Sequence, residues 1–195
     1  MSIYNFAPTI SRDPTMTFTT WQDAFTLEEL DRIEAYCETL ELNEAVIDGP
    51  SDPEIRVSQT GWISNNKDTN WFYDRLAFVA RKLNSKFYNF DLSGFVEDMQ
   101  FTVFEGNASG HYAWHIDASH NSISPRKLSI VLQLSDPLEY EGGELQTMNS
   151  NSPSSVTRQR GLIAAFPSWA LHRVTPVTSG VRKSIVVWIA GPEFR

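Results

Sequence analysis

The sequence predicts an α+β fold in which helices precede a β-rich core. Apolar residues recur at three- and four-residue steps within residues 25–42 and 65–87, which favours two amphipathic helices. Short β-prone runs then follow, separated by Gly, Pro, Asn and Ser, which is typical of a sandwich or barrel. We expect one domain over residues 1–195, with helical support at about 20–90 and a β-core at about 95–192.

The first helix is predicted by "FTLEELDRIEAYCETLEL". Thr26 and Glu29 have the spacing of a capping box, which marks a helix start. The expected buried stripe consists of Leu27, Leu30, Ile33, Tyr36 and Leu40. The single cysteine, Cys37, has no internal disulfide partner, and we expect it to be a small buried hydrophobe.

A strand and a second helix are expected before the β-core. The run "IRVSQTGWIS" is typical of a strand, and "NNKDTNWFYDRLAFVARKLNSKF" is typical of a helix. The expected buried face of that helix consists of Trp71, Leu76, Val79, Ala80 and Leu83. Neither helix carries residues that indicate chemistry.

Composition limits the partners and the compartment. Hydrophobic residues make up 41% of the chain and charged residues 21%, an ordinary globular balance. The net charge of −8 disfavours nucleic acid, whose phosphate backbone an acidic surface repels. The N-terminal stretch lacks a secretory pattern, and no apolar run reaches the ~20 residues that cross a bilayer. We therefore expect a soluble, cytoplasmic protein with no membrane partner.

The stretch "GHYAWHIDASH" contains a candidate metal site. In a strand, residues i and i+2 share a face, so His115 and Asp117 are expected to project together while Trp114 and Ile116 pack on the other side. A polar pair on an edge strand is the alternative interpretation. His172, in a later strand-like run, completes two histidines and one carboxylate, the set that non-haem Fe(II) oxygenases use while leaving coordination positions open.

An arginine follows His172 by ten residues. We expect residues 178–180 to form a turn, so that two antiparallel strands place Arg182 beside His172. A guanidinium suits a carboxylate that is bound end-on, although a surface arginine is the alternative when Arg182 is taken alone. Ser184 is expected to share its face and to donate a second hydrogen bond, whereas Lys183 should point the opposite way.

The sequence resembles the Fe(II)- and 2-oxoglutarate-dependent dioxygenases, and within them the prolyl 4-hydroxylase-like group. The resemblance rests on the segments "YAWHIDAS", "YEGGELQ", "AAFPSWALHRVTPVTSGVRKS" and "VVWIAGPEFR". Among them, "HRVTPVTSGVR" is the most specific to the family. The resemblance implies a double-stranded β-helix of the jelly-roll or cupin-like type. It also implies iron ligation by His115, Asp117 and His172, with Arg182 binding the far carboxylate of 2-oxoglutarate. The implied cofactors are Fe(II), 2-oxoglutarate and O₂, with ascorbate as a further candidate.

Two positions bear on the substrate. Prolyl hydroxylases often have a tyrosine on the strand before the His-x-Asp motif, where this chain has Phe104; Tyr112 keeps an aromatic near the cosubstrate. This departure weakens the prediction of a prolyl substrate more than that of an iron site. Asp117 disfavours halogenation, because related halogenases lack this carboxylate.

Other residues receive weaker predictions. Ser129 and Gln133 alternate with apolar residues, and they either face the cavity and orient 2-oxoglutarate or form a polar face. His111 is expected at the surface or behind the metal ligands, with metal ligation as the alternative. His120 is expected in a solvated loop, with a contact to substrate as the alternative. Gly142 and Gly143 predict a tight turn before a strand that begins at Glu144. Phe104, Trp114 and Trp188 are expected to form apolar walls of the cavity. Trp169 is expected in the core, which is also the alternative position for Trp188.

The predicted activity is hydroxylation of a substrate C–H bond with release of succinate and CO₂. A peptidyl proline or another protein side chain is the first candidate substrate, and a free amino acid or small metabolite is the second. A cupin-like metal enzyme or binding module without 2-oxoglutarate chemistry is the remaining alternative, and Arg182 is the residue that discriminates it.

Overall fold

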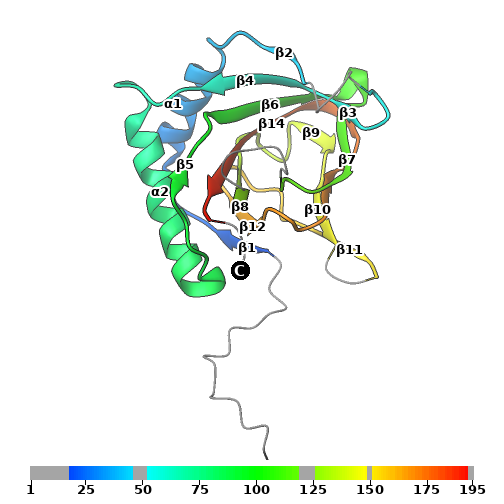
Figure 1. The fold of residues 1–195 in the computed structure, drawn as a ribbon. Helices are drawn as coiled ribbons and strands as arrows, with labels where there is room; N and C mark the ends of the chain where they lie inside the picture. The colour runs from blue at the N-terminus through cyan, green and yellow to red at the C-terminus, as the bar shows by residue number, and fades with distance from the viewer. Residues whose placement is uncertain (1–17, 46–51, 119–125, 149–150, 193–195) are drawn as a thin grey trace, which may run out of the picture.

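Two antiparallel sheets form the body of the computed structural model (Figure 1), which describes residues 18–45, 52–118, 126–148 and 151–192. The larger sheet has the order β1 (Thr19–Trp21), β12 (Ile163–Pro167), β8 (Arg126–Gln133), β14 (Val177–Ala190), β6 (Met99–Glu105), β4 (Gln59–Ile63) and β2 (Asn43–Glu44), and β5 (Gly94–Phe95) and β9 (Tyr140–Gly142) also pair with β14. The smaller sheet has the order β11 (Pro153–Ser155), β10 (Leu145–Met148), β13 (His172–Val174), β7 (His111–His115) and β3 (Arg56–Val57). The predicted α+β order is confirmed.

Helix α1 (Leu27–Cys37) begins at the predicted capping box. The Glu29 backbone N–H donates to Thr26 Oγ1 at 3.2 Å, and the Thr26 N–H donates to Glu29 Oε2 at 2.9 Å. Leu30, Ile33 and Cys37 are buried, as expected, and burial raises the pKa of the Cys37 thiol to about 12. The prediction for Leu27 is wrong: it lies in the first helical turn and is 69% exposed.

Helix α2 (Asn70–Leu83) continues into a π-helical turn, Asn84–Tyr88. Its buried residues are Phe72, Tyr73, Leu76, Val79, Ala80 and Leu83, while Trp71 is half-buried. The helical region ends at Tyr88, where Asn89 adopts a left-handed conformation, and the Asn84 side chain bonds both the N–H and the carbonyl of Phe90. Both helices cover the outer face of the larger sheet (Figure 1). Among the described residues, no helix is both long and apolar enough to cross a bilayer.

The run "IRVSQTGWIS" forms two strands rather than one. Strand β3 pairs with β7 in the smaller sheet, and β4 pairs with β6 in the larger one. This stretch therefore links the two sheets, with Ser58 between the strands. The periodicity of the run indicated extended chain but not that change of sheet.

The expected turn at residues 178–180 is wrong, because these residues lie inside β14. Ser179 pairs with Glu141 and Gly180 with Tyr140 of β9. The chain instead changes sheets between Val174 and Val177. Gly180 has φ +70°, and a Cβ there would lie 1.9 Å from the Glu139 carbonyl oxygen, so the glycine permits close approach of β9.

Gly142 ends β9, and Gly143 follows it before β10. Gly142 has φ +71° and Gly143 has φ +60°, values that favour glycine, and β10 begins one residue after Glu144.

Candidate metal centre and its cavity

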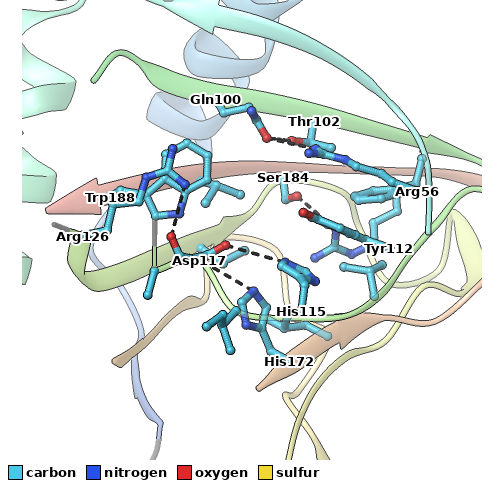
Figure 2. Close-up of a pocket in the computed structure, with 18 of the residues that line it drawn as sticks. Arg56, Gln100, Thr102, Tyr112, His115, Asp117, Arg126, His172, Ser184 and Trp188 are labelled. Atoms are coloured by element: carbon cyan, nitrogen blue, oxygen red, sulfur yellow. Dashed lines mark hydrogen bonds and ion pairs between the residues drawn. The ribbon is translucent and has the colours of Figure 1, made fainter. Parts of the chain in front are cut away.

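A cavity of about 480 Å³ lies between the two sheets. Side chains from β6, β8 and β14 of the larger sheet and from β7, β10 and β13 of the smaller sheet line it. His115, Asp117, His172 and Arg182 are all among the lining residues, and Figure 2 labels the first three. Two distant parts of the chain, one around β7 and the other containing β13 and β14, therefore bring four predicted site residues to one space.

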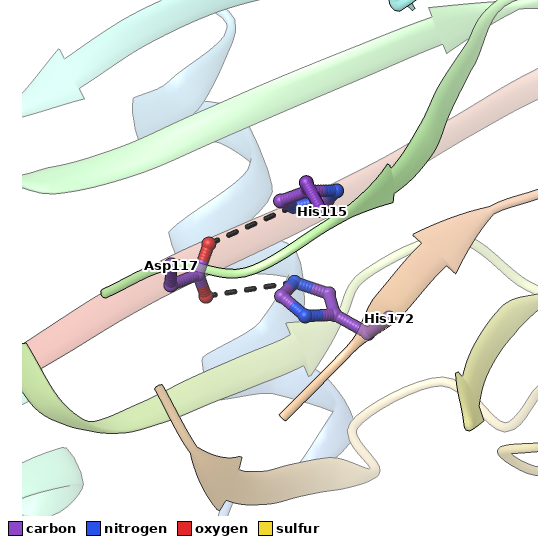
Figure 3. Close-up of side chains that lie close together, drawn as sticks. All are labelled: His115, Asp117 and His172. Atoms are coloured by element: carbon purple, nitrogen blue, oxygen red, sulfur yellow. Dashed lines mark ion pairs between the residues drawn. The ribbon is translucent and has the colours of Figure 1, made fainter. Parts of the chain in front are cut away.

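The three candidate ligands converge at one point (Figure 3). Their ligand atoms all lie within 4.8 Å of one another. His115 Nε2 is 3.6 Å from Asp117 Oδ1, and His172 Nε2 is 3.5 Å from Asp117 Oδ2. The two histidines are directly paired across β7 and β13, which explains their proximity. The set can hold a metal ion.

Asp117 reaches this cluster from outside the strand. Strand β7 ends at His115, so the expectation that both residues share one strand face is wrong. The backbone N–H groups of Asp117 and Ala118 instead donate to the Ser168 carbonyl at 2.8 and 2.9 Å. These bonds turn the chain so that the carboxylate meets both imidazoles.

Both imidazoles present the same nitrogen to the cluster. His115 Nδ1 lies 2.8 Å from the Ala113 carbonyl oxygen, and His172 Nδ1 lies 2.9 Å from that of Ala170. Because a carbonyl oxygen only accepts hydrogen bonds, each Nδ1 carries the hydrogen. Each Nε2 therefore has its lone pair directed away from the backbone and available to a metal, the arrangement expected of a ligating histidine.

The electrostatics favour the metal-binding protonation states. Burial lowers the pKa of His172 and outweighs the Asp117 carboxylate, which raises it, so the imidazole stays neutral. Burial opposes the charge on Asp117, but His172, His115 and the Ser129 hydroxyl together lower its pKa. Ser129 Oγ donates to Asp117 Oδ2 at 2.7 Å. A neutral imidazole and an ionised carboxylate are the forms that bind a divalent cation.

Arg182 is a buried cation on the opposite, larger sheet. It is 1% exposed, and it donates to Ser184 Oγ and to Gln133 Oε1, both at 3.0 Å. Burial lowers its pKa and Tyr140 raises it, but an arginine keeps its proton in proteins. No carboxylate pairs with it in the described part of the chain, and its buried Nε–H has no partner there. This arrangement suits a carboxylate ligand in the cavity.

Ser129 and Gln133 lie behind the cavity wall rather than in it. Ser129 contacts Asp117, Gln133 contacts Arg182, and neither is among the residues that line the cavity. Of the other predicted contacts, Tyr112 and Ser184 line the cavity. Tyr112 stacks on His115 with ring centroids 3.4 Å apart.

Three expectations for the cavity surroundings need correction. Phe104 and Trp188 line the cavity, but Trp114 does not, and the Arg173 guanidinium instead lies 4.6 Å from its ring. Ile116 does not pack behind the strand: it is 43% exposed and lines the cavity. Trp169 is not a core residue, because it is 45% exposed.

The remaining histidines do not join the cluster in the described residues. His111 is half-buried outside the cavity, with Nδ1 2.9 Å from the Ser109 carbonyl oxygen, which fits its prediction. His120 lies outside the described residues.

The sequence reasoning missed several polar cavity residues. Gln100 and Thr102 on β6 face the cavity, while Arg56 on β3 and Arg126 on β8 line it from either side (Figure 2). The alternation in "MQFTVFE" is a signal for the first two, because polar side chains there occupy every second position. Arg56 gave no such signal, because its role depends on the change of sheet after β3.

Comparisons with known proteins agree on one family. Residues 99–190 match the model of the 2OG-Fe(II) oxygenase superfamily. A PKHD-type hydroxylase of Synechococcus sp. (strain CC9311) is 36% identical over 90 residues, 46% of this chain and 41% of that protein. One from Janthinobacterium sp. (strain Marseille) is 37% identical over 95 residues, 46% of this chain and 41% of that protein. The chain thus spans about two-fifths of the length of these curated relatives.

Solved structures share the fold at low identity. A Pseudomonas putida prolyl-4-hydroxylase superimposes with a TM-score of 0.72 and 19% identity, covering 91% of this chain and 94% of its own. A Trichoplax adhaerens prolyl hydroxylase, in complex with a hypoxia inducible factor peptide fragment, gives a TM-score of 0.73 and 16% identity, covering 90% of this chain and 84% of its own. The predicted double-stranded β-helix is confirmed.

Similarity to this superfamily implies the cofactors Fe(II), 2-oxoglutarate and O₂, and the donor set of His115, Asp117 and His172 fits the first of them. The β-core of this chain is thus similar to the 2OG-Fe(II) oxygenase superfamily and to PKHD-type hydroxylases, and its fold is similar to that of solved prolyl hydroxylases.

Proposed function

We propose that this protein hydroxylates a substrate C–H bond with Fe(II) and 2-oxoglutarate, releasing succinate and CO₂. The observation that carries the proposal is the pairing, across one cavity, of a three-ligand cluster with a buried guanidinium that has no carboxylate partner in the described residues. One end of a dicarboxylate would reach the metal, and the other end would reach Arg182. A cupin-like metal site needs the three-ligand cluster but not the buried guanidinium.

His115, Asp117 and His172 are the proposed metal ligands. Three ligands on one side of an octahedral ion leave positions for a cosubstrate and dioxygen. Bound there, Fe(II) would supply the activation of O₂ that is coupled to oxidative decarboxylation of 2-oxoglutarate. The hydrogen bonds at each Nδ1 and the Ser129 bond to Asp117 would fix the orientation of the ligands.

Arg182 is the proposed partner of the far carboxylate of 2-oxoglutarate. Ser184 and Tyr112 line the same cavity and are proposed to bind the cosubstrate with it. Gln133 is proposed as a positioning residue, because its carbonyl oxygen accepts from Arg182 and sets the direction of the guanidinium. Phe104, Val186 and Trp188 add apolar surface that excludes water from the reacting groups.

A peptidyl proline or another protein side chain is the proposed target. The fold shared with prolyl hydroxylases, one of them in complex with a peptide, supports this choice. The cavity is partly open and is bordered by the exposed Trp62 and Ile116, which suits a substrate held by apolar contacts at the surface. A free amino acid or small metabolite is the second candidate, because a cavity of about 480 Å³ also accommodates one.

The test is an anaerobic titration of the purified protein with Fe(II) and 2-oxoglutarate. A visible charge-transfer band is expected only when both are present. A panel of proline-containing peptides and of amino acids would then be screened for substrate-dependent succinate formation. Metal binding without the band would favour the cupin-like alternative, and binding of neither would contradict the proposal.

A further inference from the structure

The arginines that line the cavity differ in what neutralises them. Arg126 forms an ion pair with Glu97, its Nε donating to Oε1 at 2.7 Å. Arg182 is assigned to the cosubstrate in the proposed function. Arg56 is the third, and in the described part of the chain it makes no ion pair with a carboxylate. A half-buried cation beside a cavity is costly unless an anion accompanies it.

All the hydrogen-bond partners of the Arg56 side chain are neutral. Its Nε donates to Ser58 Oγ at 2.8 Å, and one terminal nitrogen donates to Gln100 Oε1 at 3.0 Å. Its guanidinium carbon lies 4.5 Å from the centroid of the Tyr112 ring. These contacts hold the guanidinium plane against the cavity wall without compensating its charge. Of its five N–H donors, several therefore stay available to a ligand.

The Arg56 guanidinium stays charged although its burial opposes the charge. Burial lowers its pKa, whereas Tyr112 and the Asp117 carboxylate raise it, and an arginine keeps its proton. Asp117 is already assigned to the metal in the proposed function. Gln100 Oε1 also accepts from Thr102 Oγ1 at 3.3 Å, so the amide that contacts Arg56 is itself fixed. The cavity wall thus contains a preorganised cation rather than a mobile surface side chain.

Arg56 and Arg182 occupy different walls. Arg56 is on β3 of the smaller sheet, directly opposite Tyr112 of β7, whereas Arg182 is on β14 of the larger sheet. Arg182 is 1% exposed and deep, while Arg56 is half-buried and accessible. The cavity therefore offers two separate anion positions, and one dicarboxylate with one end on the metal uses only one of them.

We propose that Arg56 binds an anionic group of the substrate, so that the protein prefers a C–H bond close to a carboxylate. The inference rests on the proposed function and names the chemical class of its substrate. The carboxylate belongs either to a free amino acid or to an acidic side chain beside the target residue of a peptide. Both sources present the planar pair of oxygens that a guanidinium binds.

The test measures binding rather than turnover. Protein loaded with Mn(II) and 2-oxoglutarate under anaerobic conditions is titrated calorimetrically with matched probe pairs. L-Proline and L-prolinamide differ in the carboxylate of a free amino acid. The blocked tripeptides Glu-Pro-Glu and Gln-Pro-Gln differ in side-chain carboxylates. The pair that shows discrimination identifies the source of the anion.

The wild type is expected to bind the acidic member of one pair about tenfold or more tightly than the neutral member. Arg56→Gln should reduce that ratio to near one while leaving 2-oxoglutarate affinity unchanged, and Arg56→Lys should restore part of it. Arg81→Gln, which removes one exposed charge from α2, is the matched control and should keep the preference. Circular dichroism checks that each variant is folded.

Several outcomes would overturn the inference. They are equal binding within both pairs by the wild type, absence of binding of all four probes, or a preference that survives in Arg56→Gln. Weaker 2-oxoglutarate binding by Arg56→Gln would assign this arginine to the cosubstrate instead. Failure of the wild type to bind 2-oxoglutarate at all is a different result, because it contradicts the proposed function itself.

Discussion

The two faces of the larger sheet have opposite chemistry although they come from the same strands. On β14, Arg182, Ser184, Val186 and Trp188 line the cavity. The alternate residues Ile185, Val187 and Ile189 pack in the apolar cluster that includes both helices. One strand thus contributes to the site and to the main core at consecutive positions, because its side chains alternate.

Strand β6 repeats this division. Gln100 and Thr102 face the cavity, whereas Met99, Phe101 and Val103 belong to the helix-side core. The cavity face tolerates buried polar groups because they are paired or reserved for ligands, while the helix face excludes them. The comparison teaches that substitutions on the cavity face should change binding, whereas substitutions on the helix face should change stability.

The largest expected effect on the cavity face comes from removing a metal ligand. Asp117→Ala, or His115→Ala, should abolish Fe(II)-dependent turnover of 2-oxoglutarate, because two remaining ligands do not define a facial site. Succinate release and the metal content of the purified variants measure this. Unchanged succinate release from either variant would leave the assignment without a basis.

Removing the buried guanidinium should weaken binding of the cosubstrate without weakening binding of the metal. Arg182→Gln is expected to weaken 2-oxoglutarate binding by about 10- to 100-fold, because charge-assisted hydrogen bonds contribute about 1.5–3 kcal/mol. Fe(II) or Mn(II) affinity should stay nearly unchanged. Calorimetric titration with each component measures both quantities, and parallel loss of metal binding would argue that the variant disturbs the whole cavity.

Neighbouring residues on β14 provide a direct test of the division between faces. Ile185→Ala should lower the free energy of unfolding by about 2–4 kcal/mol, because it leaves a space in the helix-side core. The 2-oxoglutarate affinity of its folded molecules should not change. Ser184→Ala should show the reverse, with weaker cosubstrate binding and a smaller loss of stability. Urea unfolding measures the stability of both variants, and calorimetry measures their 2-oxoglutarate affinity. Equal losses of stability in the two variants would contradict the division between the faces.

The smallest expected effect concerns the ion pairs that join the helix face to α1. Lys183 Nζ lies 2.9 Å from Glu34 Oε1 and 3.1 Å from Glu38 Oε1. Lys183→Met should cost about 0–1 kcal/mol near pH 8, as expected of partly exposed pairs. Burial opposes the charge, but Glu34 and Glu38 raise the pKa of Lys183, so the contribution is present below the unfolded pKa and lost as the pH rises above it.

The measurement compares urea unfolding of wild type and Lys183→Met at pH 8 and at about pH 11. The difference in unfolding free energy should shrink at the higher pH. A difference that stays constant would mean that packing of the lysine chain, not its charge, accounts for the effect.

Residues with local signals were predictable from the sequence. The capping box located the start of α1, and alternation placed Arg182 and Ser184 on one face with Lys183 on the other. The His-x-Asp pair and His172 were grouped by the chemistry of their side chains, and the structure brings them within 4.8 Å. These inferences depend on short-range geometry, which a sequence encodes directly.

Long-range connections were not predictable in the same way. The turn expected before Arg182 was wrong, because Gly180 serves close packing against β9 rather than a chain reversal. Arg56 was missed because its strand changes sheets within a few residues. In both cases the local pattern is compatible with several pairings, and only tertiary contacts select one.

The Asp117 carboxylate has neighbours in both sheets. Its carboxylate accepts from Ser129 of the larger sheet, while its imidazole neighbours belong to the smaller sheet. An ion bound by all three residues would therefore join β7, the segment after it and β13 in the native state only. Such binding raises the melting temperature with ion concentration. Thermal melting would then report loading of the centre before any substrate is identified.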